Sequence, residues 1–208
     1  LPKNERNKNI MDSLKKFPAL LHDRYFLGHC LLQCFVFGAF FSYLSGSSFI
    51  FQNIYAVSSQ VYSIIFAVIG AGLLLTGALP ARLAGRVPDI VMLKYAVLVP
   101  LIGSALLLLG FYFSAPLVII LIVLFITIVP LSVMGAASFS LALSRQGKNA
   151  GSASALIGCF SMLLGACTMP LVGIAGDYTA IPMAMIMLVG HGLGTFVFYR
   201  MITADHPQ

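Results

Sequence analysis

Charged residues are scarce in this 208-residue chain, where Asp, Glu, Lys and Arg make up 9% of the residues and apolar types make up 60%. A soluble domain has roughly a quarter charged residues and less than about half apolar residues. A chain of this size exposes a large share of its surface even when folded, so it cannot hide that much apolar surface from water. The composition therefore excludes a water-soluble enzyme and a disordered chain, and it predicts a membrane protein.

Acidic side chains are missing from the middle of every long apolar stretch, although the chain has six Asp and Glu residues in all. A proton-driven pump normally carries a carboxylate at membrane depth, so the usual coupling group is absent from these stretches. The ionisable groups that do lie deep in them are His29 and His191. For His29 two interpretations stay open: a side chain of an internal cavity, or one that hydrogen-bonds lipid headgroups. The glycines on both sides of His191 favour a packed contact between helices over a proton relay.

Signatures of enzymes, metal sites and nucleic-acid binding are also missing. The four cysteines all lie in apolar stretches, and their spacing fits neither a disulfide framework nor a zinc site. The 147–149 segment lacks the upstream glycine and the Ser or Thr of a phosphate-binding loop. The net charge of +6 comes from short basic clusters, without the continuous basic surface that binds nucleic acid. We therefore expect no enzyme activity, no cofactor, no metal and no nucleic-acid partner.

Long apolar stretches are what the chain has in abundance. A helix needs roughly 20 apolar residues to cross the hydrocarbon core of a membrane. Six stretches meet this requirement, and they predict an all-α membrane protein with six transmembrane helices in a lipid bilayer. The predicted spans are 25–47, 57–80, 92–113, 116–143, 151–176 and 180–201.

Positive charge falls on one side of this six-span arrangement. All 12 Lys and Arg residues lie in segments, or at span edges, on the side that also holds residues 1–24. Because short basic loops stay in the cytoplasm, both termini are predicted to be cytoplasmic. The chain then divides into a polar cytoplasmic lead-in at 1–24, a six-helix bundle at 25–202 and a cytoplasmic tail at 203–208.

Small residues recur inside the spans. Lipid provides no hydrophobic drive for helices to associate, so small side chains that let two backbones approach closely are common at helix contacts. For these residues a packing role is favoured over contact with a ligand. The glycines for which we expect it are Gly70, Gly72, Gly151, Gly190 and Gly194.

One face of the first span combines polar and aromatic side chains. Gln33, Phe37 and Phe40 follow His29 at intervals of about one helical turn, so they share its face. Tyr43 lies about half a turn round, toward the far end of the span. A polar and aromatic face inside a span suits a cavity for amphipathic ligands, and this interpretation is favoured for Gln33.

Four segments of the sequence, at residues 1–6, 23–28, 41–55 and 149–158, resemble stretches of one family. These are the Bcr/CflA drug-resistance transporters, drug:proton antiporters in the major facilitator superfamily. Residues 1–6 resemble the end of that family's central loop, and residues 23–28 resemble the start of its seventh span. Residues 41–55 are similar to the end of the seventh span, and residues 149–158 to the start of the eleventh. The resemblance covers essentially the whole chain. It implies the second half of a twelve-span protein, which is half of a major-facilitator-type bundle built as a 3+3 inverted repeat.

The resemblance also implies a function, the proton-coupled efflux of amphipathic small-molecule drugs across the cytoplasmic membrane of a bacterium. The drug cavity would lie between this half and a missing six-span half, which would carry the coupling acid. Methionine and aromatic side chains can repack around varied ligands, although ordinary helix packing is an equal alternative for the Met and Ser positions. The residues that the resemblance assigns to the cavity are Gln33, Phe37, Phe40, Tyr43, Met134, Ser138, Ser161 and Met162.

The loop after the second span departs from the family's pattern. Residues 77–86 resemble the cytoplasmic gate motif only weakly, since Ala81 stands where the motif has Asp. Arg82 and Arg86 are therefore candidates for a gating role, and topology-setting charge is the favoured alternative. Two other functions stay open: a six-span protein that dimerises around a shared cavity with a second copy of itself, and a truncated remnant that binds ligands without transporting them.

Overall fold

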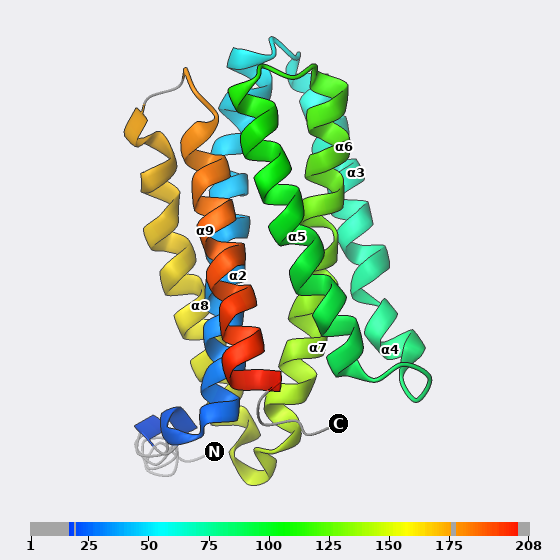
Figure 1. Cartoon of the computed structure of the whole chain (residues 1–208), viewed down its shortest axis with the longest axis vertical. Coiled ribbons are helices and arrows are strands. Elements are labelled where there is room, and N and C mark those ends of the chain that lie inside the picture. The colour runs from blue at the N-terminus through cyan, green and yellow to red at the C-terminus, as the bar shows by residue number, and fades with distance from the viewer. Residues whose placement is uncertain (1–16, 19, 176–177, 204–208) are drawn as a thin grey trace, which may run out of the picture.

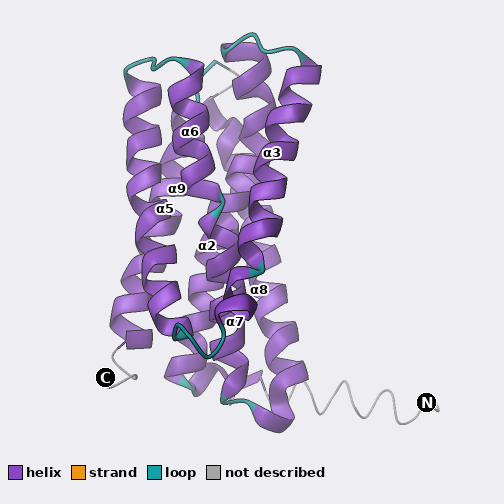
Figure 2. Cartoon of the chain, turned by 90° about the vertical axis from the view of Figure 1, so that its right-hand side faces the viewer, coloured by secondary structure: helices purple, strands orange, loops and turns teal. Residues whose placement is uncertain are grey.

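The computed structural model describes residues 17–18, 20–175 and 178–203. This part of the chain consists of helices and the loops that join them, with no strand (Figure 2). Six helical segments are long and apolar enough to cross a membrane. The predicted fold class, an all-α membrane protein with six spans, is confirmed.

Each predicted span corresponds to one helix or to a pair of consecutive helices (Figure 1). The first span is α2 (Arg24–Phe49) with the π-helical turn η1 (Ile50–Ile54), the second is α3 (Ser59–Gly77) with α4 (Leu79–Leu83), and the third is α5 (Asp89–Tyr112). The fourth span is α6 (Leu117–Ile128) with α7 (Pro130–Ser144), the fifth is α8 (Ala150–Val172), and the sixth is α9 (Ile181–Val197) with the π-helical turn η4 (Phe198–Ile202). Two short 3-10 turns, η2 (Gly147–Asn149) and η3 (Gly173–Ala175), precede and follow α8.

The first span is longer than its predicted limit at residue 47, because it continues as a helix to Ile54. The run of Ser and Gly at residues 45–48 suggested an end, but Ser47 Oγ hydrogen-bonds the Leu44 carbonyl and the Tyr62 hydroxyl of α3. Phe51 is buried, and its ring packs against that of Tyr62. Tertiary contacts with α3 therefore carry the helix past its polar residues.

A proline divides the fourth span into two helices. Pro130 begins α7 and has no backbone N–H to continue the hydrogen-bond ladder of α6. At the break, the Thr76 hydroxyl of α3 donates to the Val129 carbonyl at 3.1 Å and contacts Ser132 Oγ at 2.8 Å. The interruption thus becomes a polar contact with α3.

Helix α2 occupies the centre of the bundle. It packs extensively against α8, α9 and α7, while α5 packs against α9, α7 and α6, and α3 packs mainly against α7. These contacts repeat when each of the first three spans is replaced by the span three places later, and each of the last three by the span three places earlier. The contact between α2 and α8, for example, then corresponds to the contact between α7 and α3. The packing agrees with the predicted 3+3 arrangement.

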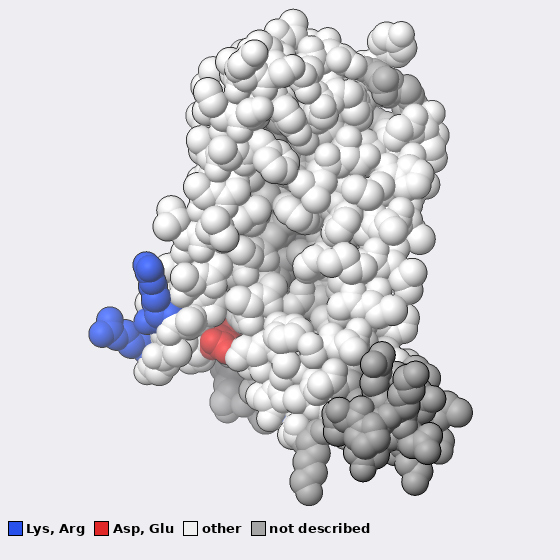
Figure 3. Space-filling model, turned by 180° about the vertical axis from the view of Figure 1, so that it is seen from behind, with Lys and Arg blue, Asp and Glu red and all other residues white. Residues whose placement is uncertain are grey.

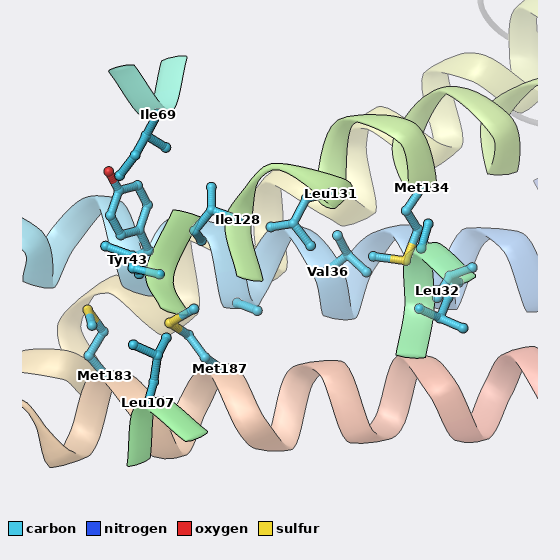
Figure 4. Close-up of a cluster of buried hydrophobic side chains, with 14 of the residues drawn as sticks. Leu32, Val36, Tyr43, Ile69, Leu107, Ile128, Leu131, Met134, Met183 and Met187 are labelled. Atoms are coloured by element: carbon cyan, nitrogen blue, oxygen red, sulfur yellow. The ribbon is translucent and has the colours of Figure 1, made fainter. Parts of the chain in front are cut away.

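The buried apolar core runs along α2 (Figure 4). Side chains from α3, α5, α6, α7 and α9 converge on it. Figure 4 labels ten of them: Leu32, Val36, Tyr43, Ile69, Leu107, Ile128, Leu131, Met134, Met183 and Met187.

The outer helices differ widely in burial. In the most apolar window of the Arg24–Ile54 span 56% of the residues are buried, against 28% for Ala150–Val172 and 17% for Ser59–Leu83. On α3, Leu74 is 80% exposed and Leu75 is 68% exposed. The bundle therefore presents apolar surface along α3 and α8 that lipid or another helical unit would cover.

The start of α2 and the end of α9 lie at the same end of the bundle (Figure 1), where Arg24 Nη2 donates to the Arg200 carbonyl at 3.2 Å. The described Lys and Arg side chains all lie near this end, which we name the basic end. Figure 3 shows one face of the molecule, with blue side chains near the basic end and none near the opposite end. Most of the 1–24 lead-in and most of the 203–208 tail lie outside the described residues. The described basic side chains are those of Arg24, Arg82, Arg86, Lys94, Arg145 and Arg200.

Candidate functional site

A groove of about 380 Å³ lies between α7 and α8, with α2 as its floor. It exists because α7 and α8 make few contacts with each other while both pack against α2. We name it the α7–α8 groove. Its lining residues are Gln33 and Phe37 from α2, Gly135, Ala136 and Phe139 from α7, and Ile157, Gly158, Ser161 and Met162 from α8.

Two polar side chains in this groove have hydrogen-bonding capacity to spare. Gln33 is 5% exposed, and its Nε2 donates to the Gly135 carbonyl at 2.8 Å. Ser161 is 3% exposed and lies beside the thiol of Cys34, and its Oγ has no hydrogen-bond partner within the described part of the chain. A buried hydroxyl without a partner is costly unless a ligand or water satisfies it. The groove thus combines aromatic and thioether surface with a hydroxyl available to a ligand.

Below the groove, a series of polar contacts joins α2 to α7 in antiparallel register. His29 Nδ1 lies 2.9 Å from Ser138 Oγ, and the Tyr25 ring meets the His29 ring edge-on at 4.7 Å. Arg145 lies over the Tyr25 ring, 3.8 Å from its centroid. Because His29 is fully buried in this contact, it belongs to the helix interface, and neither the cavity nor the headgroup interpretation describes it.

The structure brings four of the eight predicted cavity residues together: Gln33, Phe37, Ser161 and Met162 all line the α7–α8 groove. The other four lie outside it. Ser138 is held by His29, and Met134 belongs to the buried core. Tyr43 is buried and stacks on Phe66 of α3, and Phe40 is half-buried between the rings of Phe41 and Tyr43.

Five lining residues were not among the predicted ones. All five lie within one helical turn of a predicted residue on the same helix, so extending Ser138 and Ser161 by steps of three and four residues would have found most of them. They are Gly135, Ala136, Phe139, Ile157 and Gly158.

The five glycines with an expected packing role occupy two kinds of environment. A Cβ on Gly72 would lie 2.6 Å from Val129, one on Gly190 would lie 2.9 Å from the Phe35 carbonyl oxygen, and one on Gly194 would lie 3.2 Å from Leu32. Gly70 and Gly151 have no atom within 4 Å of such a Cβ, so they face outward.

The remaining candidates lie away from the groove. Arg82 and Arg86 are exposed at the basic end, on either side of the turn made by Gly85, whose φ is +78°. His191 Nδ1 lies 2.6 Å from Ser104 Oγ of α5, which also donates to the Pro100 carbonyl. His191 thus makes the packed helix contact that its flanking glycines favoured. Among the described residues, no three His, Cys, Asp or Glu side chains gather closely enough to hold a metal ion.

The chain is similar to YdgK of Bacillus subtilis (strain 168), an uncharacterized MFS-type transporter, with 38% identity over 191 residues. The alignment covers 92% of this chain and 47% of the relative, so the chain spans about half the length of the protein it matches. No protein-family model and no solved structure matches the chain. The similarity supports a transporter of the major facilitator type. The relative is described as MFS-type without a subfamily, so the Bcr/CflA resemblance stays a prediction.

Proposed function

We propose that this chain is one six-helix half of a major facilitator superfamily transporter, and that the α7–α8 groove forms part of the wall of its substrate cavity. The similarity to an MFS-type transporter over 92% of the chain carries the proposal. The relative is about twice as long as the aligned region, which leaves room for a second six-helix unit. The 3+3 packing around α2 supports the same conclusion.

The second unit would cover α3 and α8. These are the two least buried spans, and they stand on either side of the surface that holds α7. Gly70 on α3 and Gly151 on α8 have open space where a Cβ would stand, so the backbone of another helix can approach them closely. The groove would then face the second unit and become one side of an enclosed cavity.

The transported molecules would be amphipathic drugs, as the Bcr/CflA resemblance implies, and protons would drive their export. Phe37, Phe139 and Met162 offer adaptable apolar contacts, and Gln33 and Ser161 offer hydrogen bonds. No Asp or Glu lies in the middle of a span, so the coupling carboxylate would come from the second unit.

The chain would lie in the cytoplasmic membrane of a bacterium with its basic end in the cytoplasm. This orientation rests on the excess of Lys and Arg at that end. Arg82 and Arg86 would then lie at the cytoplasmic mouth of the cavity, where a gating role is possible only if they contact the second unit.

Transport in vesicles tests this proposal. The chain is reconstituted alone, and in parallel together with the part of the Bacillus relative that it does not match. Under an imposed pH gradient, we expect efflux of ethidium only when both parts are present. Efflux by the chain alone would contradict the half-transporter proposal and favour a homodimer. No efflux from the paired sample, despite complex formation, would contradict drug export.

A further inference from the structure

A second groove lies on the opposite side of α2, between α8 and α9, and has a volume of about 290 Å³. It arises as the first one does, because α8 and α9 have few direct contacts and both pack against α2. We name it the α8–α9 groove. Its lining includes Phe35, Gly38 and Ala39 from α2, Leu164, Thr168 and Leu171 from α8, and Met185, Ile186, Val189, Gly190 and Leu193 from α9.

This groove offers apolar contacts alone. Thr168 is its one side chain with a polar atom, and its hydroxyl already contacts the carbonyl oxygens of Gly165 at 2.9 Å and Gly38 at 3.0 Å. The groove lies between two transmembrane helices, open to the surroundings of the bundle. An occupant must therefore be a hydrocarbon chain or another purely apolar group.

The groove leads toward two arginines at the basic end. Arg24 lies about three helical turns below Phe35 on the same face of α2. Arg200 lies about two turns below Leu193, in the π-helical turn η4 that continues α9. Arg24 Nη2 donates to the Arg200 carbonyl, which places its guanidinium over the end of α9. Both side chains are exposed, and within the described residues no carboxylate contacts either of them.

The distance from the arginines to the groove matches the depth of one membrane leaflet. Leu193 lies about 10 Å, and Val189 about 16 Å, above Arg200 along α9 and η4, at a rise of up to about 1.5 Å per residue. One leaflet contributes about 15 Å to the hydrocarbon core. A lipid whose phosphate sits at the arginines would therefore place an acyl chain in the groove.

We infer that this surface binds an anionic phospholipid, with the phosphate held by Arg24 and Arg200 and an acyl chain in the α8–α9 groove. Within the described part of the chain neither guanidinium has a carboxylate partner, and two such groups favour a lipid with net negative charge over a zwitterionic one. Arg82 and Arg86 are also exposed at the basic end, but neither lies on a helix that lines the α8–α9 groove. They provide a matched control pair.

Thermal unfolding in detergent tests the charge part of this inference. Phosphatidylglycerol should raise the unfolding temperature of the native chain more than phosphatidylcholine with the same acyl chains. The double substitution Arg24→Gln and Arg200→Gln should remove this difference, and Arg82→Gln with Arg86→Gln should keep it. A preference for phosphatidylglycerol that survives in the first variant would overturn the site. Equal stabilisation by inorganic phosphate alone would also overturn it, because the acyl chain would then contribute nothing.

Fluorescence quenching tests the acyl-chain part. The chain has no tryptophan, so Phe196→Trp gives a single reporter between the groove and Arg200. Phe196 is 62% exposed, and Tyr95 of α5 is 64% exposed at a similar distance from the basic end, so Tyr95→Trp is the control. Lipid brominated on its acyl chains should quench F196W more as phosphatidylglycerol than as phosphatidylcholine, and quench Y95W equally in both forms. Equal quenching of F196W by the two lipids would contradict the inference.

Discussion

The two grooves on either side of α2 share one origin and differ in chemistry. Each forms where two helices pack against α2 and leave a gap between themselves, and α8 is a wall of both. The floor of the α7–α8 groove is Gln33 and Phe37, and that of the α8–α9 groove includes Phe35 and Gly38. One face of a single helix thus suits ligands that form hydrogen bonds, and the opposite face suits hydrocarbon. The difference follows from which side chains α2 turns toward each gap.

The largest effect on stability is expected from a bulky side chain where α9 packs closely against α2. A Cβ on Gly190 would lie 2.9 Å from the Phe35 carbonyl oxygen, and the backbone there cannot move without shifting α2. We expect Gly190→Leu to destabilise the bundle by about 1–3 kcal/mol, the typical cost of overpacking. Gly151→Leu, in open space, should leave stability nearly unchanged. Thermal unfolding in detergent measures both, and equal unfolding temperatures for the two variants would show that α9 does not depend on this close approach.

Filling the α7–α8 groove should weaken the binding of the dye without changing the binding of lipid. Gly158 lines it and has no atom within 4 Å of the position that a Cβ would take, so Gly158→Phe can begin its side chain there without a clash at Cβ and extend its ring into the groove. We expect at least a tenfold loss of ethidium affinity, about 1.4 kcal/mol, with the preference for phosphatidylglycerol unchanged. Gly151→Phe on the same helix is the control, and both variants are measured in the chain without a second unit. Unchanged dye binding in G158F would place the drug contact outside this groove.

Two serines on either side of α2 should respond in opposite ways. Ser161→Ala removes a buried hydroxyl that has no hydrogen-bond partner among the described residues, so stability should hold or rise while ligand affinity falls by about 0.5–1.5 kcal/mol. Ser138→Ala removes the contact with His29, so stability should fall by about 1–3 kcal/mol with little change in affinity. Dye titration measures the affinity of both variants and thermal unfolding measures their stability, and each variant should lower only one of the two. A loss of stability in S161A would mean that its hydroxyl already has a structural partner.

A small effect on stability, and none on lipid preference, is expected from a substitution inside the α8–α9 groove. The Thr168 hydroxyl is occupied by backbone carbonyls, so a lipid chain gains nothing from it. Thr168→Val should leave the phosphatidylglycerol preference unchanged and cost about 0.5–1.5 kcal/mol of stability, the usual net value of a hydrogen bond. A clear loss of that preference in T168V would show that the groove recognises a polar group.

The sequence was sufficient for the six spans and for part of the groove, because both depend on helical periodicity. Spacing places Gln33 and Phe37 on one face, and the structure puts both in the groove. Spacing does not reveal which neighbouring helix packs against each end of that face. Tyr43 continues along the helix but packs against Phe66 of α3, and so it lies in the core.

Two glycines of α3 also show that the sequence does not reveal which face of a helix packs against the bundle. Gly70 and Gly72 stand two residues apart on α3, which turns them to different sides of the helix. Gly72 meets Val129 and Phe125 closely, and Gly70 meets nothing. Both have the composition expected of a helix contact, and only the tertiary arrangement decides which side faces the bundle.

The position of α2 between two grooves has a thermodynamic consequence. Any displacement of α2 changes the shape of both gaps together. If a lipid in one gap favours one position of α2, it changes the affinity for a molecule in the other gap, and by reciprocity that molecule changes the affinity for the lipid by the same factor. The activity of such a bundle would then vary with the headgroup composition of its membrane, although the lipid and the transported molecule never meet.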